Sequence, residues 1–489
     1  MLMRSALREL PPPPPLPVDS ERPPPGRRVW WLAPHWLLLL TVVPSAVAAL
    51  LAPSRWYNEL WRTPKYVDAA AVVYVAAAVA ALLAGLVAGQ RLIARHPSSP
   101  LDRTDATTHG VLVRSARVLL ALTIVGYVAY ILAAARSGIG PADIVAVLQG
   151  LNNFDEPLKD RLGNIPGLTT LTQCGAAFIV VEAVLSTRCG DRRFTKYAVA
   201  LLVVCAARAL LMSERLALIE VVLPFVLTRV LTGRRRSARR ERVVALAPVL
   251  AVPALLVGFG AMEYARSWVW YSQNSDFTFV EFVGARLTGY YATSYNNGEM
   301  RRQFDHYPQR LPFESVELFW QFPAVEALLP YDEVTDGPTK PESFDVLLER
   351  HANPEFNSPG GYLSPIIDLG LPGGLAFLAV VGTLIGAAHA ASRANAVLGL
   401  LLYPICCVAL LEWPRYQYLS QGRALPMLLC LLVVGIRVNE QAARHRRRVR
   451  VMPARGTTAA PARKTVVPPA PALLPSPVAV GAVAQGSAR

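Results

Sequence analysis

Arginine residues close to acidic and aromatic residues are the side chains in this sequence that could bind a phosphate group and promote its departure. Arg208 and Arg215 lie on either side of a short polar break between two apolar stretches, and Glu220 follows shortly after. A planar guanidinium matches phosphate oxygens with paired hydrogen bonds. Charges this close to apolar stretches also form structural Arg–Glu pairs. The pattern therefore predicts either an anion site for a lipid-linked phosphate or a structural ion pair.

A second set of polar residues lies in a long hydrophilic segment, in the sequence RLTGYYATSYNNG that begins at Arg286. If this sequence is helical, Arg286, Tyr290 and Asn297 share one face, because with Thr293 they recur at intervals of three and four. Asn296 is the immediate neighbour of that face. A cation, a phenol, a hydroxyl and an amide together suit a sugar or a phosphate, although a polar surface helix would show the same pattern.

Candidate general bases follow near the end of the hydrophilic segment. They are His351, Glu355 and Asp368, whose side chains can accept a proton from a hydroxyl group. The glycines and prolines between them predict a broken or re-entrant entry into the next apolar stretch. Paired glycines in this region would also allow helices to pack closely.

Three more arginines lie at the predicted ends of apolar stretches, namely Arg266, Arg415 and Arg423. Tryptophans close to Arg266 fit an interfacial aromatic belt. Arginines that come from separate segments on one side of a membrane could converge on a diphosphate. Such convergence would explain why they occur on the side where basic residues are disfavoured in short loops.

The elements that must position these residues are apolar helices. Of the 489 residues, 53% are hydrophobic and 17% are charged, whereas about a quarter are charged in soluble domains. The apolar residues form blocks of roughly 17–23 residues, which match the thickness of a bilayer core. We therefore expect an all-α, polytopic membrane protein with about ten transmembrane helices. The expected spans are residues 33–52, 67–89, 118–135, 168–186, 197–212, 216–232, 243–262, 369–390, 395–411 and 424–437.

The distribution of positive charge predicts the orientation. The formal net charge is +15, but arginines border the apolar blocks and do not form one basic domain, so we expect contacts with membrane lipids and no nucleic acid. We expect the helix in the stretch 197–231 to be interrupted at residues 213–215. Basic clusters flank this stretch on both sides, so the chain must cross the membrane an even number of times within it. Both termini are then cytoplasmic, and the protein is expected in the cytoplasmic (inner) membrane.

Three parts of the chain follow from this topology. Residues 1–32 are expected to be a disordered, Pro-rich cytoplasmic tail, and residues 438–489 a disordered, basic, Ala/Pro-rich one. Residues 33–437 form the transmembrane domain, in which residues 263–368 are a large, partly helical extracytoplasmic loop. A loop of this length in a compact protein indicates a functional role. The six cysteines indicate neither a disulfide framework nor a zinc motif, and no metal or cofactor is expected.

The chain resembles bacterial O-antigen polymerases, also called oligosaccharide repeat unit polymerases. The resemblance covers most of residues 33–437, but neither tail, and the single large late loop fits it as well. The matching sequences are SERLALIE at residues 213–220, the segment 286–298, FNSPGG at residues 356–361 followed by DLG at residues 368–370, and the late Arg415.

The resemblance implies a membrane glycosyltransferase that joins polyprenyl-diphosphate-linked repeat units on the outer face of the cytoplasmic membrane. It implies a metal-independent reaction in which arginines stabilise the departing diphosphate, a role that it assigns to Arg215, Arg286 and Arg415. The implied partners are the polyprenyl-diphosphate-linked oligosaccharide, flippase proteins and chain-length regulator proteins. Members of the family often have more spans than the ten expected for this chain.

Three alternatives remain open on the sequence. An O-antigen-ligase-like transferase would use nearly the same architecture with a different acceptor. A mannosyltransferase-type enzyme usually has an acidic pair in its first outer loop, whereas residues 52–66 contain Glu59 as their one acidic residue. A transporter or flippase of polysaccharide or lipid-linked oligosaccharide would be expected to show more charges within its spans, or two related halves.

Overall fold

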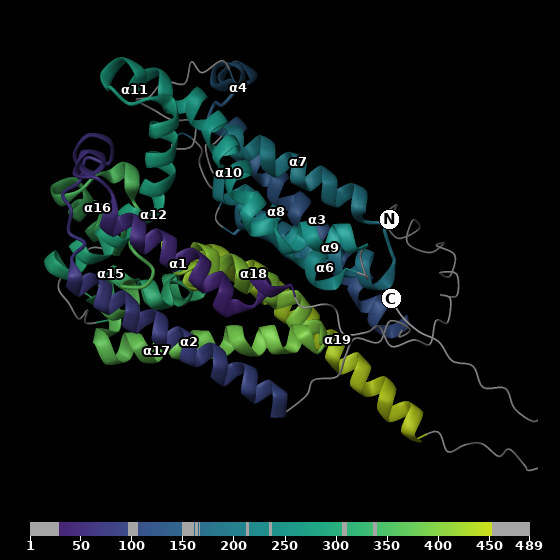
Figure 1. The fold of residues 1–489 in the computed structure, drawn as a ribbon. Helices are drawn as coiled ribbons and strands as arrows, with labels where there is room; N and C mark the ends of the chain where they lie inside the picture. Colours follow the sequence, from purple (N-terminus) through teal and green to yellow (C-terminus); the bar gives the residue numbers. More distant parts are fainter. Residues whose placement is uncertain are drawn as a thin grey trace, which may run out of the picture. The chain divides into compact units, whose positions relative to one another are not determined.

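The computed structural model describes residues 29–95, 106–148, 161, 165, 167–211, 215–233, 237–305, 311–335 and 340–451, and every regular element in these ranges is a helix (Figure 1). The chain divides into a main unit, residues 1–443, and a terminal unit, residues 444–489. The predicted tails, residues 1–32 and 438–489, lie mostly outside the described residues, but residues 438–451 are helical, so the prediction of disorder was wrong for them. In the terminal unit, residues 444–451 are described, and they are helical.

Six helical segments of the described chain are long and apolar enough to cross a membrane. A bent pair of helices, α9 (Ala238–Ala245) and α10 (Ala247–Glu263), which meet at 62°, adds a seventh if the pair is one span. The chain is therefore a multi-pass membrane protein. The six segments are α1 (Pro34–Leu51), α2 (Ala69–Arg95), α3 (Ala106–Arg136), α6 (Cys174–Val184) with its flanking turns, α17 (Ser364–Arg393) and the first part of α19 (Leu425–Val451).

The other three expected spans are also helices, but they are shorter or more charged. They are α7 (Thr195–Leu211), α8 (Arg215–Thr232) and α18 (Val397–Glu412). Helix α18 has 16 residues, about 24 Å against a hydrocarbon core of about 30 Å. The break expected at residues 213–215 coincides with the gap between α7 and α8, of which residues 212–214 lie outside the described chain. Ten crossings stay a prediction.

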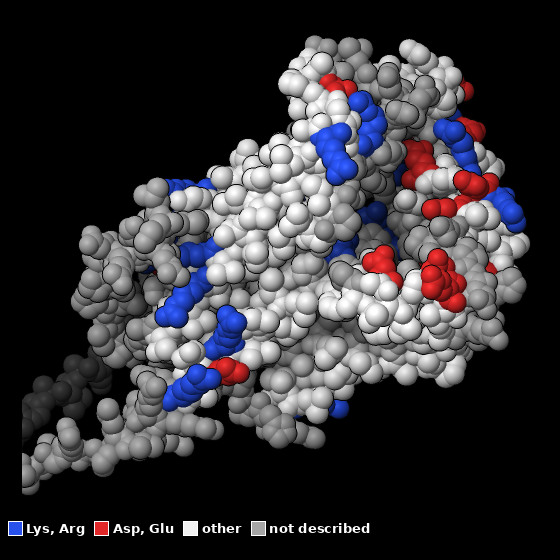
Figure 2. All heavy atoms as spheres, turned by 180° about the vertical axis from the view of Figure 1, so that it is seen from behind, with Lys and Arg blue, Asp and Glu red and all other residues white. Residues whose placement is uncertain are grey.

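The surface carries its charges in two places. On the face shown in Figure 2, charged side chains gather towards two ends, and the surface between them is almost free of charge. One end has mostly Lys and Arg, whereas the other has both signs. An uncharged band between charged ends is typical of a protein that spans a membrane.

Helices α2 and α17 pack against each other along much of their length (Figure 1). Their contact depends on small residues, because a Cβ atom added at Gly85 would lie 2.1 Å from the carbonyl oxygen of Ala379, and one added at Gly382 would lie 2.3 Å from that of Leu82. Glycine at such positions allows two helix backbones to approach closely. Helix α17 is interrupted at Gly370, where φ is 72°. This interruption confirms the predicted broken entry into that apolar stretch.

The hydrophilic segment 263–368 folds largely into helices, and its position on the outer side of the membrane stays a prediction. Its longest element is α12 (Phe279–Phe304), which begins where the Thr278 hydroxyl accepts a hydrogen bond from the Glu281 amide. The other α-helices are α11 (Val269–Asn274), α13 (Glu317–Trp320), α14 (Pro323–Leu328), α15 (Tyr331–Thr335) and α16 (Lys340–His351), with 3-10 turns η6 (Glu314–Val316) and η7 (Pro354–Phe356). Helix α12 packs against α1, α10, α16 and α17.

Candidate functional site

Arg286 lies fully buried on α12 between two carboxylates. One guanidinium nitrogen, Nη2, donates to Glu355 of η7, and Nε lies 3.5 Å from Oε2 of Glu263 at the end of α10. The guanidinium is also 5.1 Å from the ring centroid of Phe356. Burial lowers the pKa of Arg286, but the ion pair with Glu355 outweighs this effect and raises it. Arg286 is thus a permanent buried cation, and it holds Glu355, whose side chain is 33% exposed.

Arg415 lies just after the end of α18, next to two tyrosine rings. Its Nη1 donates to Oε2 of Glu412 over 2.9 Å, and its guanidinium is 5.6 Å from the ring centroid of Tyr290 and 5.2 Å from that of Tyr416. One carboxylate uses at most two of the five N–H donors of an arginine. The side chain of Arg415 is 22% exposed, although its Nε is buried.

Arg423 completes a group of three arginines that come from separate parts of the chain. Its Nε lies 3.4 Å from Oε1 of Glu220 on α8, and its side chain is 35% exposed. Arg415 and Arg423 both act electrostatically on the phenol of Tyr416. On the other side of this group, Tyr290 packs against the Phe356 ring that faces Arg286, at 5.9 Å between centroids. We call Arg286, Tyr290, Arg415, Tyr416 and Arg423 the arginine–tyrosine cluster.

A pair of glycines brings the two halves of this cluster together. The amide of Gly360 donates to the carbonyl oxygen of Arg415 over 3.0 Å, and φ at Gly360 is 87°. A Cβ atom at Gly361 would lie 2.2 Å from the carbonyl oxygen of Trp413. A larger residue at either position would force the loop after η7 away from the loop after α18. The sequence FNSPGG therefore acts here as a close backbone contact.

The other three predicted arginines contribute no described side chain to the cluster. The guanidinium of Arg208 lies 4.7 Å from the ring centroid of Tyr130 on α3. Arg215 is the first residue of α8, and Arg266 lies in the helical turn after α10. The side chains of Arg215 and Arg266 lie outside the described part of the chain. Three of the six predicted arginines are thus brought together.

The two predicted asparagines connect neighbouring loops. Oδ1 of Asn296 accepts from the amide of Tyr66 over 2.7 Å, and its Nδ2 donates to the carbonyl oxygen of Pro64 over 2.8 Å. Nδ2 of Asn297 donates to the carbonyl oxygens of Phe356 and Ser358 over 2.6 and 3.1 Å. Both side chains are buried, and the loop that Asn297 holds borders the cluster through Phe356.

Of the predicted general bases, Glu355 lies at the cluster, whereas His351 and Asp368 lie elsewhere. The His351 ring stacks on Phe304, at 4.2 Å between centroids and an interplanar angle of 7°. Asp368 is buried in α17, where its Oδ2 accepts from the amide of Ser315 over 2.7 Å. This bond ties η6 to α17.

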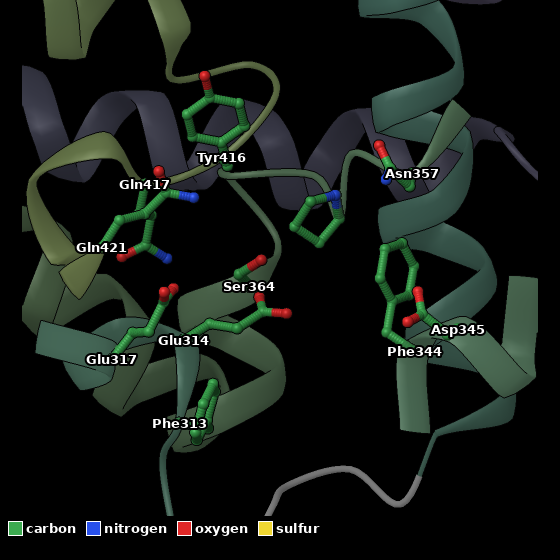
Figure 3. Close-up of a pocket in the computed structure, with 11 residues that line it drawn as sticks. Phe313, Glu314, Glu317, Phe344, Asp345, Asn357, Ser364, Tyr416, Gln417 and Gln421 are labelled. Carbon is green, nitrogen blue, oxygen red and sulfur yellow. The ribbon is translucent and has the colours of Figure 1, made fainter. Parts of the chain in front are cut away.

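A cavity of about 330 Å³ lies next to the arginine–tyrosine cluster and shares Tyr416 with it (Figure 3). In Figure 3, the side chains of Glu314, Glu317, Ser364 and Gln421 converge from one side, and those of Asn357 and Asp345 face them from the other. Burial, followed by the nearby Glu314 carboxylate, raises the pKa of Glu317 to about 7. We call this the acidic cavity; it is lined by Phe313, Glu314, Glu317, Phe344, Asp345, Asn357, Pro359, Ser364, Tyr416, Gln417 and Gln421.

The acidic residues and the glutamines of this cavity were not predicted from the sequence. Glu314, Glu317 and Asp345 are ordinary hydrophilic residues of the long segment, with no spacing that marks a site. Gln417 and Gln421 are four residues apart and flank Tyr418, which is the one local signal that could have drawn attention to them. Within the described ranges, no group of three or more His, Cys, Asp or Glu residues is arranged to hold a metal ion.

No protein-family model, curated protein or solved structure matches this chain.

Proposed function

We propose that this protein is a membrane glycosyltransferase that polymerises polyprenyl-diphosphate-linked oligosaccharide repeat units. The observation that carries the proposal is that Arg415 packs against Tyr416, on which Arg423 also acts electrostatically, at the border of the acidic cavity. Two partly exposed guanidinium groups can bind a diphosphate. The adjoining carboxylates, amides and aromatic rings suit a sugar. A lipid-linked glycan has both chemical parts, joined at one bond.

The arginines would act on the leaving group. When a sugar hydroxyl attacks the anomeric carbon of the growing chain, the bond to the diphosphate breaks and negative charge develops on the phosphate oxygens. Guanidinium groups already placed at that position stabilise the charge as it develops, and one such donor typically contributes a factor of about 10²–10³ in rate. Arg415 and Arg423 have the exposure that this contact requires.

Arg286 has a different role in this proposal. Its side chain is fully buried, so it acts through the residues around it. The ion pair holds Glu355 beside Phe356 and Tyr290, next to Arg415. Arg286 is therefore a positioning residue of the cluster. Arg215, at the start of the helix that carries Glu220, is assigned to the diphosphate through the resemblance to the polymerase family.

The charge distribution supports an outer-face location for this chemistry. The cluster and the cavity are built largely from the hydrophilic segment 263–368 and from the loop after α18. The mostly basic end of the surface in Figure 2 is the one that the positive-inside rule places in the cytoplasm. In this proposal both termini are cytoplasmic, the segment 263–368 is extracytoplasmic, and the chain crosses the inner membrane about ten times.

The test is a polymerisation assay with purified full-length protein in lipid nanodiscs. The substrate is the polyprenyl-diphosphate-linked repeat unit extracted from a source strain that lacks this gene. We expect a ladder of products that differ by one repeat unit. The variant Arg415→Ala should lower the rate by about 10²–10³, whereas Arg350→Ala, at an exposed arginine of α16, should leave it unchanged.

Two outcomes would contradict this proposal. If the wild-type protein forms no glycosidic bond between repeat units, it is not a polymerase. If a single transfer to another acceptor replaces the ladder, the protein is a ligase with the same donor. The melting temperatures of both variants separate loss of function from loss of folding.

A further inference from the structure

Two polar atoms at the acidic cavity have no partner within the described chain. They are Nε2 of Gln417 and Oε1 of Gln421, and both atoms are buried. Gln417 is 4% exposed. Buried polar groups in folded proteins nearly always have a hydrogen-bond partner. A buried donor and a buried acceptor at a single cavity therefore indicate a bound polar molecule.

The charge of the cavity limits what that molecule can be. Glu314, Glu317 and Asp345 line it, and Arg301 pairs with Glu314 over 2.9 Å without lining the cavity itself. Carboxylates accept hydrogen bonds from hydroxyl or ammonium groups and repel anions. A molecule with many hydroxyl groups fits this environment, whereas a phosphate or a uronic acid does not.

The apolar part of the lining supports a sugar. The rings of Phe313 and Phe344 contribute to the wall of the cavity. Pockets for small molecules typically combine apolar and aromatic walls with a few placed polar groups, and have volumes of about 300–1,000 Å³. At about 330 Å³, this cavity is at the small end, as expected for one or two sugar residues of a longer glycan.

The cavity also lies where an acceptor should be. Arg415 packs against Tyr416, which lines the cavity. Arg423 acts electrostatically on both Tyr416 and Glu317. A sugar held in the cavity is therefore adjacent to a diphosphate held by these arginines, which is the arrangement that transfer between them requires.

We propose, resting on the polymerase function above, that the acidic cavity binds the acceptor sugar of the incoming repeat unit, a neutral or amino sugar, and that Glu317 removes the proton from its attacking hydroxyl. The hydroxyl oxygen forms a bond to the anomeric carbon of the growing chain. The bond between that carbon and the diphosphate oxygen breaks, and its electron pair leaves with the polyprenyl diphosphate. The proton moves to the Glu317 carboxylate and then to water.

Glu317 is better suited to this step than the other carboxylates of the cavity. Oε2 of Glu314 already accepts a hydrogen bond from Arg301 over 2.9 Å, so this carboxylate is less available to an incoming hydroxyl group. Glu317 accepts a hydrogen bond from the backbone amide of Gly422, which orients it, and its pKa is raised to about 7. A general base works best when its pKa is close to the working pH.

The main test is the pH dependence of polymerisation by the wild-type protein, Glu317→Gln and Glu317→Asp. The initial rate of the wild type should fall about tenfold per pH unit below about pH 7, because Glu317 becomes protonated. The rate of Glu317→Gln should be lower by about 10²–10⁴ and should no longer fall with pH below about pH 7. Glu317→Asp should have a reduced rate that still falls at low pH. Glu326→Gln, an equivalent change at an exposed position on α14, is the matched control.

A second measurement tests binding without catalysis. The repeat unit released from its lipid by mild acid is the probe, and its binding is followed by saturation-transfer NMR. Gln417→Leu should weaken binding about tenfold, because the sugar loses a hydrogen bond in a buried site. Arg350→Ala should bind it as the wild type does.

The two measurements distinguish the possible failures. If the wild type makes a ladder and Glu317→Gln matches it in rate and pH profile, the role of Glu317 is overturned and the polymerase function stands. If a ladder forms but Gln417→Leu binds the released glycan normally, the cavity is not the acceptor site. If no ladder forms although Gln417→Leu weakens glycan binding, the polymerase function and the role of Glu317 are overturned, while the sugar site stands. If no ladder forms and Gln417→Leu binds the released glycan normally, the polymerase function, the role of Glu317 and the sugar site are all overturned.

Discussion

The arginine–tyrosine cluster and the acidic cavity are neighbours with opposite charge. They share Tyr416, and helix α12 supports both, through Arg286 near its start and Arg301 near its end. In the cluster, Arg415 and Arg423 are partly exposed, and Glu412 and Glu220 pair with them. In the cavity, carboxylates form part of the lining, and the buried Arg301 pairs with Glu314. The difference shows how one segment can present an anion site and a sugar site side by side, as a substrate with a diphosphate and a glycan requires.

The first prediction concerns the buried Arg286, which supports the cluster. Replacing Arg286 by Leu should lower the free energy of unfolding by about 3–5 kcal/mol, because it breaks a fully buried ion pair with Glu263. Unfolding of the purified protein in detergent measures this change. The triple variant with Glu263→Gln and Glu355→Gln should recover part of the loss. An Arg286→Leu protein as stable as the wild type would show that the buried pair contributes nothing.

The second prediction concerns the difference in charge between the arginine–tyrosine cluster and the acidic cavity. Arg423→Gln should weaken binding of the lipid-linked repeat unit by about 1.5–3 kcal/mol, roughly tenfold or more, because one charged donor to the diphosphate is lost. Binding of the glycan released from its lipid should not change. Both affinities can be measured with the same protein in nanodiscs. Equal losses for the two ligands would mean that the cluster and the cavity are one site.

The third prediction concerns the connection between the two regions. Asn297→Leu removes the donor to the carbonyl oxygens of Phe356 and Ser358, and leaving such buried groups unsatisfied costs about 1–3 kcal/mol. The loop that it holds carries Glu355 at one end and Pro359 of the cavity at the other. Thermal unfolding should reveal the loss, and both binding affinities should fall together. If the affinity for only one of the two ligands changed, the loop held by Asn297 would not connect the cluster and the cavity.

The smallest effect is expected at His351, which contributes to neither region. Its replacement by Leu loses the stacking on Phe304, which is worth about 0.5–1.5 kcal/mol, and should leave polymerisation unchanged. The ladder assay and a melting curve check both statements. If a well-folded His351→Leu protein made no ladder, His351 and not Glu317 would be the base.

Much of the helical fold could be predicted from the sequence. Nine of the ten expected apolar stretches fall largely on one helix each, and the stretch 243–262 falls on the bent pair α9 and α10. This agreement is expected, because hydrophobicity and length are local properties of the chain. The break at Gly370 was also predicted from its glycines and prolines. The alignment of Arg286 with Tyr290 followed from helical spacing. The number of crossings was not settled in the same way, since α7, α8 and α18 are shorter or more charged than the others.

The acidic cavity and the pairing of the arginines depend on the tertiary structure. Glu317 and Gln417 meet across a hundred residues of chain, and the contact of Gly360 with Arg415 joins two loops that no local pattern connects. The sequence by itself determined which residues are apolar and which are charged, because these are properties of each side chain. Only the folded chain decided which charges meet and which are buried, because pairing and desolvation depend on neighbours that are distant in sequence.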